Sequence, residues 1–164
     1  MEYKKDKRTK NLTLRDIHVG DWVQVWSEQA ERYSPPLKII QICDDGTIYL
    51  VTSDEERCTP WEEDIKNVDA LEITPELLKG FGFELREKRD ITYGFVEYIF
   101  YGNLHIGHLY SYDNGKIECS LSCDKRAYFS YMHEMCDVMW GKFPDVKLEW
   151  KGILSVTLIL NGKE

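Results

Sequence analysis

The sequence lacks the features that place a protein in or across a membrane. No apolar run among its 164 residues approaches the roughly 18–20 residues that a membrane-spanning helix needs. The first ten residues, MEYKKDKRTK, do not contain the apolar stretch of a secretory signal peptide. We therefore expect neither an integral membrane protein nor a secreted one, and no membrane partner.

The sequence also lacks an even set of cysteines. It has five, at positions 43, 58, 119, 123 and 136. An odd number without a secretory signal is typical of reduced thiols in the cytoplasm, not of a disulfide framework. We predict a cytoplasmic protein.

Complete catalytic motifs are missing as well. The chain has no G-x-S-x-G elbow, no phosphate-binding loop, no G-x-G-x-x-G and no calcium-binding loop. The tetrapeptide His105-Ile-Gly-His108 matches the H-I-G-H motif of class I aminoacyl-tRNA synthetases, but it lies in an alternating strand pattern. We interpret it as two strand histidines beside a closely packed glycine. We expect no catalytic residue and no cofactor.

Charge is unevenly distributed along the chain. The 29 acidic and 21 basic side chains give a net charge of -8, which excludes a generally basic nucleic-acid binder. Residues 44–76 hold eleven acidic side chains against two basic ones. This window is either a solvated surface or a docking face for a basic protein partner. The candidate partner-binding residues are Asp54, Glu55, Glu56, Trp61, Glu62, Glu63 and Asp64.

The amino-terminal residues carry the opposite charge. The first ten contain five basic and two acidic side chains, and we expect residues 1–11 to form a flexible basic tail. Residues 2–10, together with the barrel aromatics Trp22 and Trp26, offer an alternative function in nucleic-acid contact. The alternation of residues 21–26 places both tryptophans on one face of a strand, where they are either exposed or packed between the two halves of the chain.

Residues 12–73 are predicted to form a small SH3-like β-barrel. Period-two alternation and β-branched residues indicate short strands, and an Asp-Gly pair at Asp45-Gly46 favours a hairpin turn. The expected strands cover residues 21–26, 37–42, 47–51 and 61–65.

Residues 74–164 are predicted to form an α+β part. It begins with a short helix from Thr74 to Gly80, with Thr74 as the N-cap and Pro75 in the first turn. A meander of about four antiparallel strands follows, and then a long helix over about 124–141 that packs on the meander. One or two terminal strands are expected at 146–150 and 153–160. The fold class is therefore α+β, mainly antiparallel β.

Two weaker patterns resemble zinc sites. His133, Glu134 and Asp137 have the spacing of a His-Glu-x-x-His metal helix with Asp in the second ligand position, which would make the chain a degenerate zinc hydrolase. Cys119, Cys123, His133 and Cys136 have the residue types of a structural zinc site, although not a standard spacing. A buried Cys more commonly acts as a small hydrophobe, so we expect no bound metal.

Three segments, LRDIHVGDWVQVW, LEITPELLKGFGF and YFSYMHEMCDVMWG, carry a resemblance over residues 12–141. In their order and separation the chain resembles a family of uncharacterised proteins abundant in Bacteroidetes genomes and mobile elements. The resemblance implies an SH3-like amino-terminal part and a carboxy-terminal α+β part, and it implies no activity. Tyr131 and His133 match the family's helix motif, whereas Cys136 and the segment after Gly141 depart from it.

These observations predict a non-enzymatic cytoplasmic binding or adaptor module. Its partner would be a protein, a basic one if the acidic window is the docking face. The sequence leaves the identity of the partner and the oligomeric state open.

Overall fold

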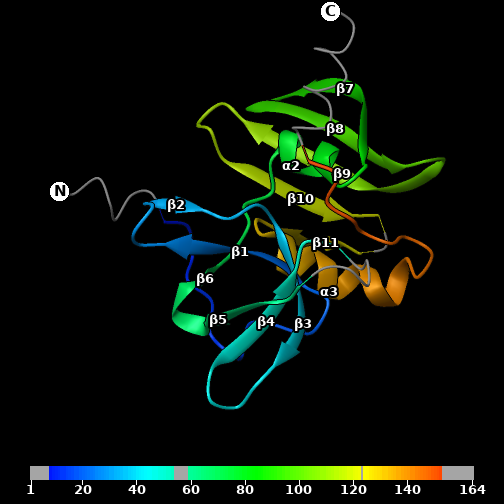
Figure 1. Cartoon of the computed structure of the whole chain (residues 1–164). Helices are drawn as coiled ribbons and strands as arrows, with labels where there is room; N and C mark the ends of the chain where they lie inside the picture. Colours follow the sequence, from blue (N-terminus) through cyan, green and yellow to red (C-terminus); the bar gives the residue numbers. More distant parts are fainter. Residues whose placement is uncertain (1–7, 54–58, 123, 153–164) are drawn as a thin grey trace, which may run out of the picture. The chain divides into compact units, whose positions relative to one another are not determined.

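Alternating strands and short turns produce two antiparallel sheets in the computed structural model, which describes residues 8–53, 59–122 and 124–152 (Figure 1). The chain divides into two compact units. The first contains the residues up to Glu72 together with Tyr131–Gly141, and the second contains Ile73–Ser130 and the residues from Lys142 onward. The fold class is α+β and mainly antiparallel β, as the sequence predicts.

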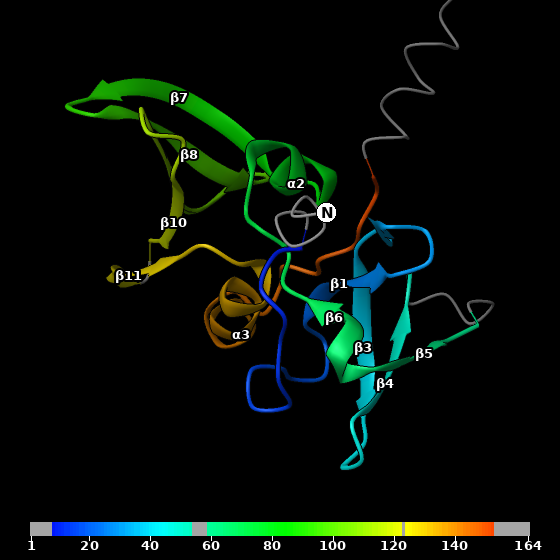
Figure 2. The ribbon, with the colours of Figure 1, turned by 90° about the vertical axis from the view of Figure 1, so that its left-hand side faces the viewer.

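The first unit is built on a curled, six-stranded half-barrel sheet (Figure 2). Its strand order is β2-β1-β3-β4-β5, and β6 pairs with β1. Each of the expected strands at 21–26, 37–42, 47–51 and 61–65 is present to within a residue or two. The elements are β1 (Trp22–Ser27), β2 (Arg32–Tyr33), β3 (Leu37–Ile42), β4 (Thr47–Val51), β5 (Trp61–Asp64), the 3-10 helix η1 (Ile65–Asn67) and β6 (Val68–Asp69).

Both faces of β1 are buried, for different reasons. Val23 and Val25 point into the apolar core of the half-barrel, which also contains residues of β3, β4 and β6. Trp22 and Trp26 have the opposite parity and are also buried. The backbone of Trp22 lies against the thiol of Cys136, and Trp26 packs on Tyr33 with ring centroids 4.9 Å apart. The period-two pattern therefore predicts the parity of the tryptophans but not what covers them.

The second unit contains a five-stranded antiparallel meander in the order β11-β10-β9-β8-β7. Glycines permit close approach in this sheet. A Cβ at Gly107 would lie 2.0 Å from the carbonyl oxygen of Ser120 on the neighbouring strand. The strands are β7 (Glu84–Ile91), β8 (Gly94–Tyr101), β9 (Leu104–Tyr112), β10 (Ile117–Leu121) and β11 (Asp124–Phe129).

The short helix α2 (Pro75–Gly80) opens the second unit. The Thr74 side chain accepts a hydrogen bond from the Leu77 amide (3.1 Å), and Pro75 occupies the first turn, so the predicted capping is confirmed. Among the described residues, no helix combines the length and the apolar character needed to cross a membrane.

The prediction of one long helix over about 124–141 is wrong for its first part. Residues Asp124–Phe129 form β11, and the helix α3 covers only Met132–Lys142. Tyr128 is exposed and Phe129 buried, which is the period-two pattern of an edge strand paired with β10. Because hydrogen bonding to β10 stabilises this strand, tertiary pairing overrides the helical spacing that includes these two aromatics.

The partner of α3 also differs from the prediction. Tyr131–Gly141 belongs to the first unit, and the buried side chains of α3 include Met132, Met135 and Met139. The Met132 amide donates a 2.8 Å hydrogen bond to the carbonyl of Leu71, which joins the helix start to the end of the half-barrel segment. The chain thus returns to the half-barrel after completing the meander.

The expected strand at 146–150 is not regular in the structure. This segment instead places Trp150 on Phe81, with ring centroids 5.1 Å apart, and directly over Gly80. The Lys151 amide donates a 2.8 Å hydrogen bond to the Gly80 carbonyl. The segment therefore covers the end of α2 by side-chain packing. The second expected strand, at 153–160, lies outside the described residues.

Candidate functional site

A groove of about 820 Å³ lies in the first unit, where the two ends of the curled sheet come near each other. One wall comes from the end of β1, the following turn and β2, and the other comes from β5 and η1. Since β2 and β5 are the two edges of the sheet order, the groove marks the place where the half-barrel stays open. Unpaired strand edges and aromatic side chains are what extended peptides bind.

Two aromatic side chains form one wall of the groove. Trp26 packs edge-on against Tyr33, and Tyr33 is fixed at its hydroxyl. This hydroxyl donates a 2.7 Å hydrogen bond to Asp69 Oδ2 and accepts one of 2.6 Å from the Thr9 amide. Burial and the neighbouring carboxylate raise the pKa of Tyr33, so the hydroxyl stays protonated as a donor. The wall is therefore rigid before any ligand binds.

The carboxylate of Asp69 is the centre of a buried network. Its side chain is fully buried and accepts hydrogen bonds from Arg8 Nε (2.8 Å) and Nη2 (2.6 Å) and from Asn11 Nδ2 (3.1 Å). A bidentate guanidinium–carboxylate pair satisfies a buried charge well. Asp69 thus belongs to the structural interior, although the sequence counts it in the acidic window.

The contacts of Arg8 and Lys10 with the rest of the first unit concern the predicted flexible basic tail. Residues 1–7 lie outside the described part of the chain, but Arg8 binds Asp69 and lies 4.0 Å from Glu28. The ammonium of Lys10 lies over the ring of Tyr131, 5.6 Å from its centroid, and the Lys10 carbonyl accepts from Ala70. Residues 8–11 therefore pack against the half-barrel, and the flexible tail stays a prediction for residues 1–7. Both cations contact their own chain, as do Trp22 and Trp26, so these four lend the nucleic-acid alternative no support.

The predicted partner-binding residues separate into distinct groups. Trp61, 39% exposed, and Glu63 line the groove. Glu62 accepts a 3.0 Å hydrogen bond from the Tyr49 hydroxyl, and Asp64 caps η1 by accepting from the Lys66 amide. The remaining three, Asp54, Glu55 and Glu56, lie outside the described residues.

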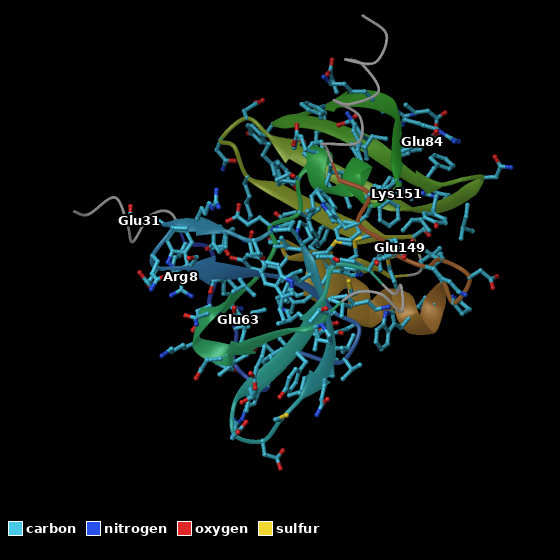
Figure 3. The ribbon with its side chains drawn as sticks, in the orientation of Figure 1. Arg8, Glu31, Glu63, Glu84, Glu149 and Lys151 are labelled. Carbon is cyan, nitrogen blue, oxygen red and sulfur yellow. The ribbon has the colours of Figure 1, made fainter. Side chains whose placement is uncertain are left out.

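The lining of the groove carries both signs of charge, and its residue Glu63 is labelled in Figure 3. Glu28 and Glu63 supply negative charge, whereas Arg32 and Lys66 supply positive charge. The groove is therefore amphipathic with a mixed rim, and the acidic character of the 44–76 window does not dominate it.

The residues of the hydrolase alternative have other contacts in α3. Glu134 Oε1 accepts a 3.2 Å hydrogen bond from the Tyr131 amide and so caps the helix start. His133 is buried and its ring lies near that of Tyr131, with centroids 6.1 Å apart, and burial lowers its pKa. Asp137 pairs with His18 at 3.0 Å. The one group of possible metal donors in the described part of the chain is His18, Asp21 and Asp137, which includes neither His133 nor Glu134.

The cysteine set is distributed over both units. Cys119 lies in β10 of the second unit, and Cys136 lies in α3 with the first. Burial raises the pKa of each of these thiols to about 12, so both are protonated at neutral pH. Cys123 lies outside the described residues, so the four-residue zinc site stays an untested alternative to the prediction of no bound metal.

The prediction that His105 and His108 lie in a strand is confirmed. They lie in β9 on one face of the meander, with ring centroids 5.0 Å apart, and both contact the ring of Tyr98. Gly107 between them allows the close approach to Ser120 described above. The tetrapeptide is thus part of an aromatic sheet face.

Comparison of the chain with models of known protein families, with curated proteins and with solved structures found no match. The resemblance to a Bacteroidetes family that the three sequence segments suggested stays a prediction. Sequence reasoning missed the groove residues Tyr33 and Arg32 and the supporting residues Arg8 and Asp69. The alternation of residues 21–26 could have pointed to Trp26 as part of one wall of the groove. The residues of the opposite wall lie far from Trp26 in the sequence, so no local pattern places them opposite it.

Proposed function

We propose that the protein is a non-enzymatic binding module, an SH3-like half-barrel whose groove takes an extended segment of a partner protein. The observation that carries the proposal is the groove of about 820 Å³ between the two edges of the sheet. Its walls contain a preorganised aromatic pair and the partly exposed Trp61. Rigid aromatic walls lower the entropic cost of binding. The proposed cytoplasmic location is supported by the odd cysteine count of the sequence.

The lining of the groove suggests the chemistry of its occupant. An apolar side chain of the partner would pack between Trp61 and Tyr33, which are the accessible aromatic surfaces. A Lys or Arg side chain of the partner would pair with Glu63, which is the predicted acidic residue that lines the groove. The aromatic contact supplies most of the affinity, and the rim charges set the orientation of the bound segment.

Selection from a phage-displayed library of random peptides on the immobilised full chain tests the proposal. We expect enriched peptides to combine an apolar and a basic residue and to perturb the indole NMR signals of Trp26 and Trp61. Trp61→Ala should weaken a synthetic copy of such a peptide by about tenfold or more, as for an aromatic hot spot. Tyr93→Ala is the matched control, because Tyr93 is a strongly exposed aromatic of the second unit. Failure to enrich any peptide, or equal binding to Trp61→Ala, would overturn the proposal.

A charge reversal tests the orientation of the bound segment. Glu63→Lys should weaken the peptide that carries a basic residue and improve a copy with Glu at that position. Glu149→Lys is the control, because Glu149 is an exposed acid of the second unit (Figure 3). Equal effects of the two reversals would show that net charge, and not the groove, governs binding.

A further inference from the structure

The loop before β1 and the helix α3 are held together within the first unit. Gly20 has φ +97°, and its amide donates a 2.7 Å hydrogen bond to the Ile39 carbonyl. The ring of Trp140 lies directly over Gly20, so closely that a Cβ there would be 1.7 Å from Trp140 Cζ2. This packing places the loop residues His18 and Asp21 beside Asp137 of α3.

The donor atoms of these three side chains converge. His18 Nδ1 lies 3.0 Å from Asp137 Oδ2 and 3.8 Å from Asp21 Oδ2, and all three donors lie within 4.8 Å of one another. Zinc–ligand bonds of roughly 2.0–2.1 Å in tetrahedral geometry separate ligand atoms by about 3.3 Å. The two His18 distances bracket that value and the Asp21 and Asp137 donors lie within 4.8 Å of each other, so small adjustments of the partly exposed His18 and Asp137 side chains would close the site.

Asp21 provides the independent sign of a ligand. Its side chain is 0% exposed, and its Oδ2 accepts a 2.8 Å hydrogen bond from the His18 amide. Its Oδ1 is buried and has no hydrogen-bond partner among the described residues. A buried carboxyl oxygen without a partner is costly, and a metal ion that replaced the carboxyl proton would give this oxygen a partner. His18 Nδ1 faces both carboxyl groups, so an ion bound between the three side chains would meet one imidazole nitrogen and two carboxylate oxygens.

We propose that His18, Asp21 and Asp137 bind one divalent metal ion of the Zn²⁺ or Mn²⁺ class, with solvent in the remaining coordination positions. One imidazole and two carboxylates suit these ions, whereas Ca²⁺ takes six to eight oxygen ligands. The side chains of His18 and Asp137 are 63% and 30% exposed, which gives the ion a route from solvent. The bound ion would connect α3 to the loop before β1. The inference is independent of the groove, since none of the three residues lines it.

Metal titrations of the full chain, first stripped with EDTA, test the site. We expect calorimetry with Zn²⁺ to include one ion whose binding His18→Ala and Asp137→Asn each weaken by at least about tenfold. Paramagnetic Mn²⁺ should broaden the amide NMR signals of residues 18–21 and 137 first. The matched controls are His105→Ala and Asp145→Asn, a histidine and an acid of the second unit, and both should retain the site.

Thermal unfolding of the ligand variants shows whether they still fold. Thermal unfolding in EDTA should be nearly unchanged by His18→Ala, because that side chain is mostly exposed. Zn²⁺ should raise the melting temperature of the wild type more than that of either ligand variant. Equal Zn²⁺ affinity in the wild type and both ligand variants, or Mn²⁺ broadening centred on other residues, would overturn the proposal. No binding at millimolar Zn²⁺ and Mn²⁺ would do the same.

Discussion

Replacement of Gly20 by Ala should destabilise the first unit strongly. At φ +97° an L-residue is strained, which costs about 1–2 kcal/mol. The new Cβ would also lie 1.7 Å from Trp140 Cζ2, and because Trp140 is 51% exposed its ring can shift toward solvent, so we expect relief of this overlap to cost about 1 kcal/mol at most. We therefore expect Gly20→Ala to lower the free energy of unfolding by about 1–3 kcal/mol. With an m-value of about 2 kcal/mol per molar urea, the midpoint should fall by roughly 0.5–1.5 M.

Urea unfolding followed by tryptophan fluorescence measures the effect, and a double-variant cycle with Trp140→Ala separates its causes. Trp140→Ala removes the ring that overlaps the new Cβ, so the two substitutions should couple by about 1 kcal/mol. Gly46→Ala is the control in the same unit, because Gly46 has φ +93° but its Cβ would meet only Ile65 Cγ2 at 3.3 Å. Additive effects of Gly20→Ala and Trp140→Ala would refute the reasoning, since the ring would then not lie on the loop.

Three further predictions concern the first unit. Tyr33→Phe should cost about 1–2 kcal/mol, because it removes a hydrogen bond to the buried charge of Asp69, and urea unfolding checks it. Burial and a hydrogen bond with Asp137 raise the pKa of Asp21 from 3.8 to about 9, so without a metal ion its folded form keeps a proton that the unfolded chain loses. Its contribution to the free energy of unfolding should therefore decline as the pH rises from about 4 toward 9. Asp21→Asn should lose that part of the pH dependence when unfolding is measured in EDTA. Peptide binding in the groove should weaken only about two- to threefold between 0.1 and 0.5 M NaCl, and a loss of a hundredfold would indicate docking by the acidic surface instead.

The strands could be predicted because their signals are local. Alternation between Trp22 and Trp26 and the turn at Asp45-Gly46 identify neighbouring elements directly from adjacent residues. The cap at Thr74 is equally local, since the side chain bonds an amide three residues later. Such features depend little on the rest of the fold, so the sequence is sufficient to find them.

The helix α3 was only partly predictable, because the residues just before it fit both the helical spacing of apolar side chains and the two-residue alternation of a strand. Tyr128 and Phe129 continue the apolar spacing of Met132 and Met135, yet they form the end of an edge strand. Only the pairing of Phe129 with Cys119 in β10 decides between strand and helix there. That contact joins residues ten positions apart through a turn, and a helical pattern within the segment does not reveal it.

The candidate sites depend on contacts that no spacing in the sequence encodes. Arg8 and Asp69 are 61 residues apart, and His18 and Asp137 are 119 residues apart. The sequence drew attention to Asp137, but as the partner of His133 on the same helix. The chain's return from the meander to the half-barrel gives Asp137 a different histidine, and that return could not be inferred from periodicity.

The structure changes how the acidic window of residues 44–76 should be understood. A docking face needs carboxylates that are free to meet a partner, but several described acids of the window already have partners within the chain. Asp45 accepts from the Thr47 amide in the hairpin turn, Asp64 caps η1, and Asp69 holds Arg8 inside the unit. Three of the eight described acids of the window therefore serve a turn, a helix cap and a buried ion pair. Glu63, in contrast, lines the groove beside Trp61, so selectivity for a partner should arise where an acid and an aromatic side chain share one surface. If the groove binds a partner as proposed, charge density along the sequence is a poorer guide to the interface than the open edge of the half-barrel.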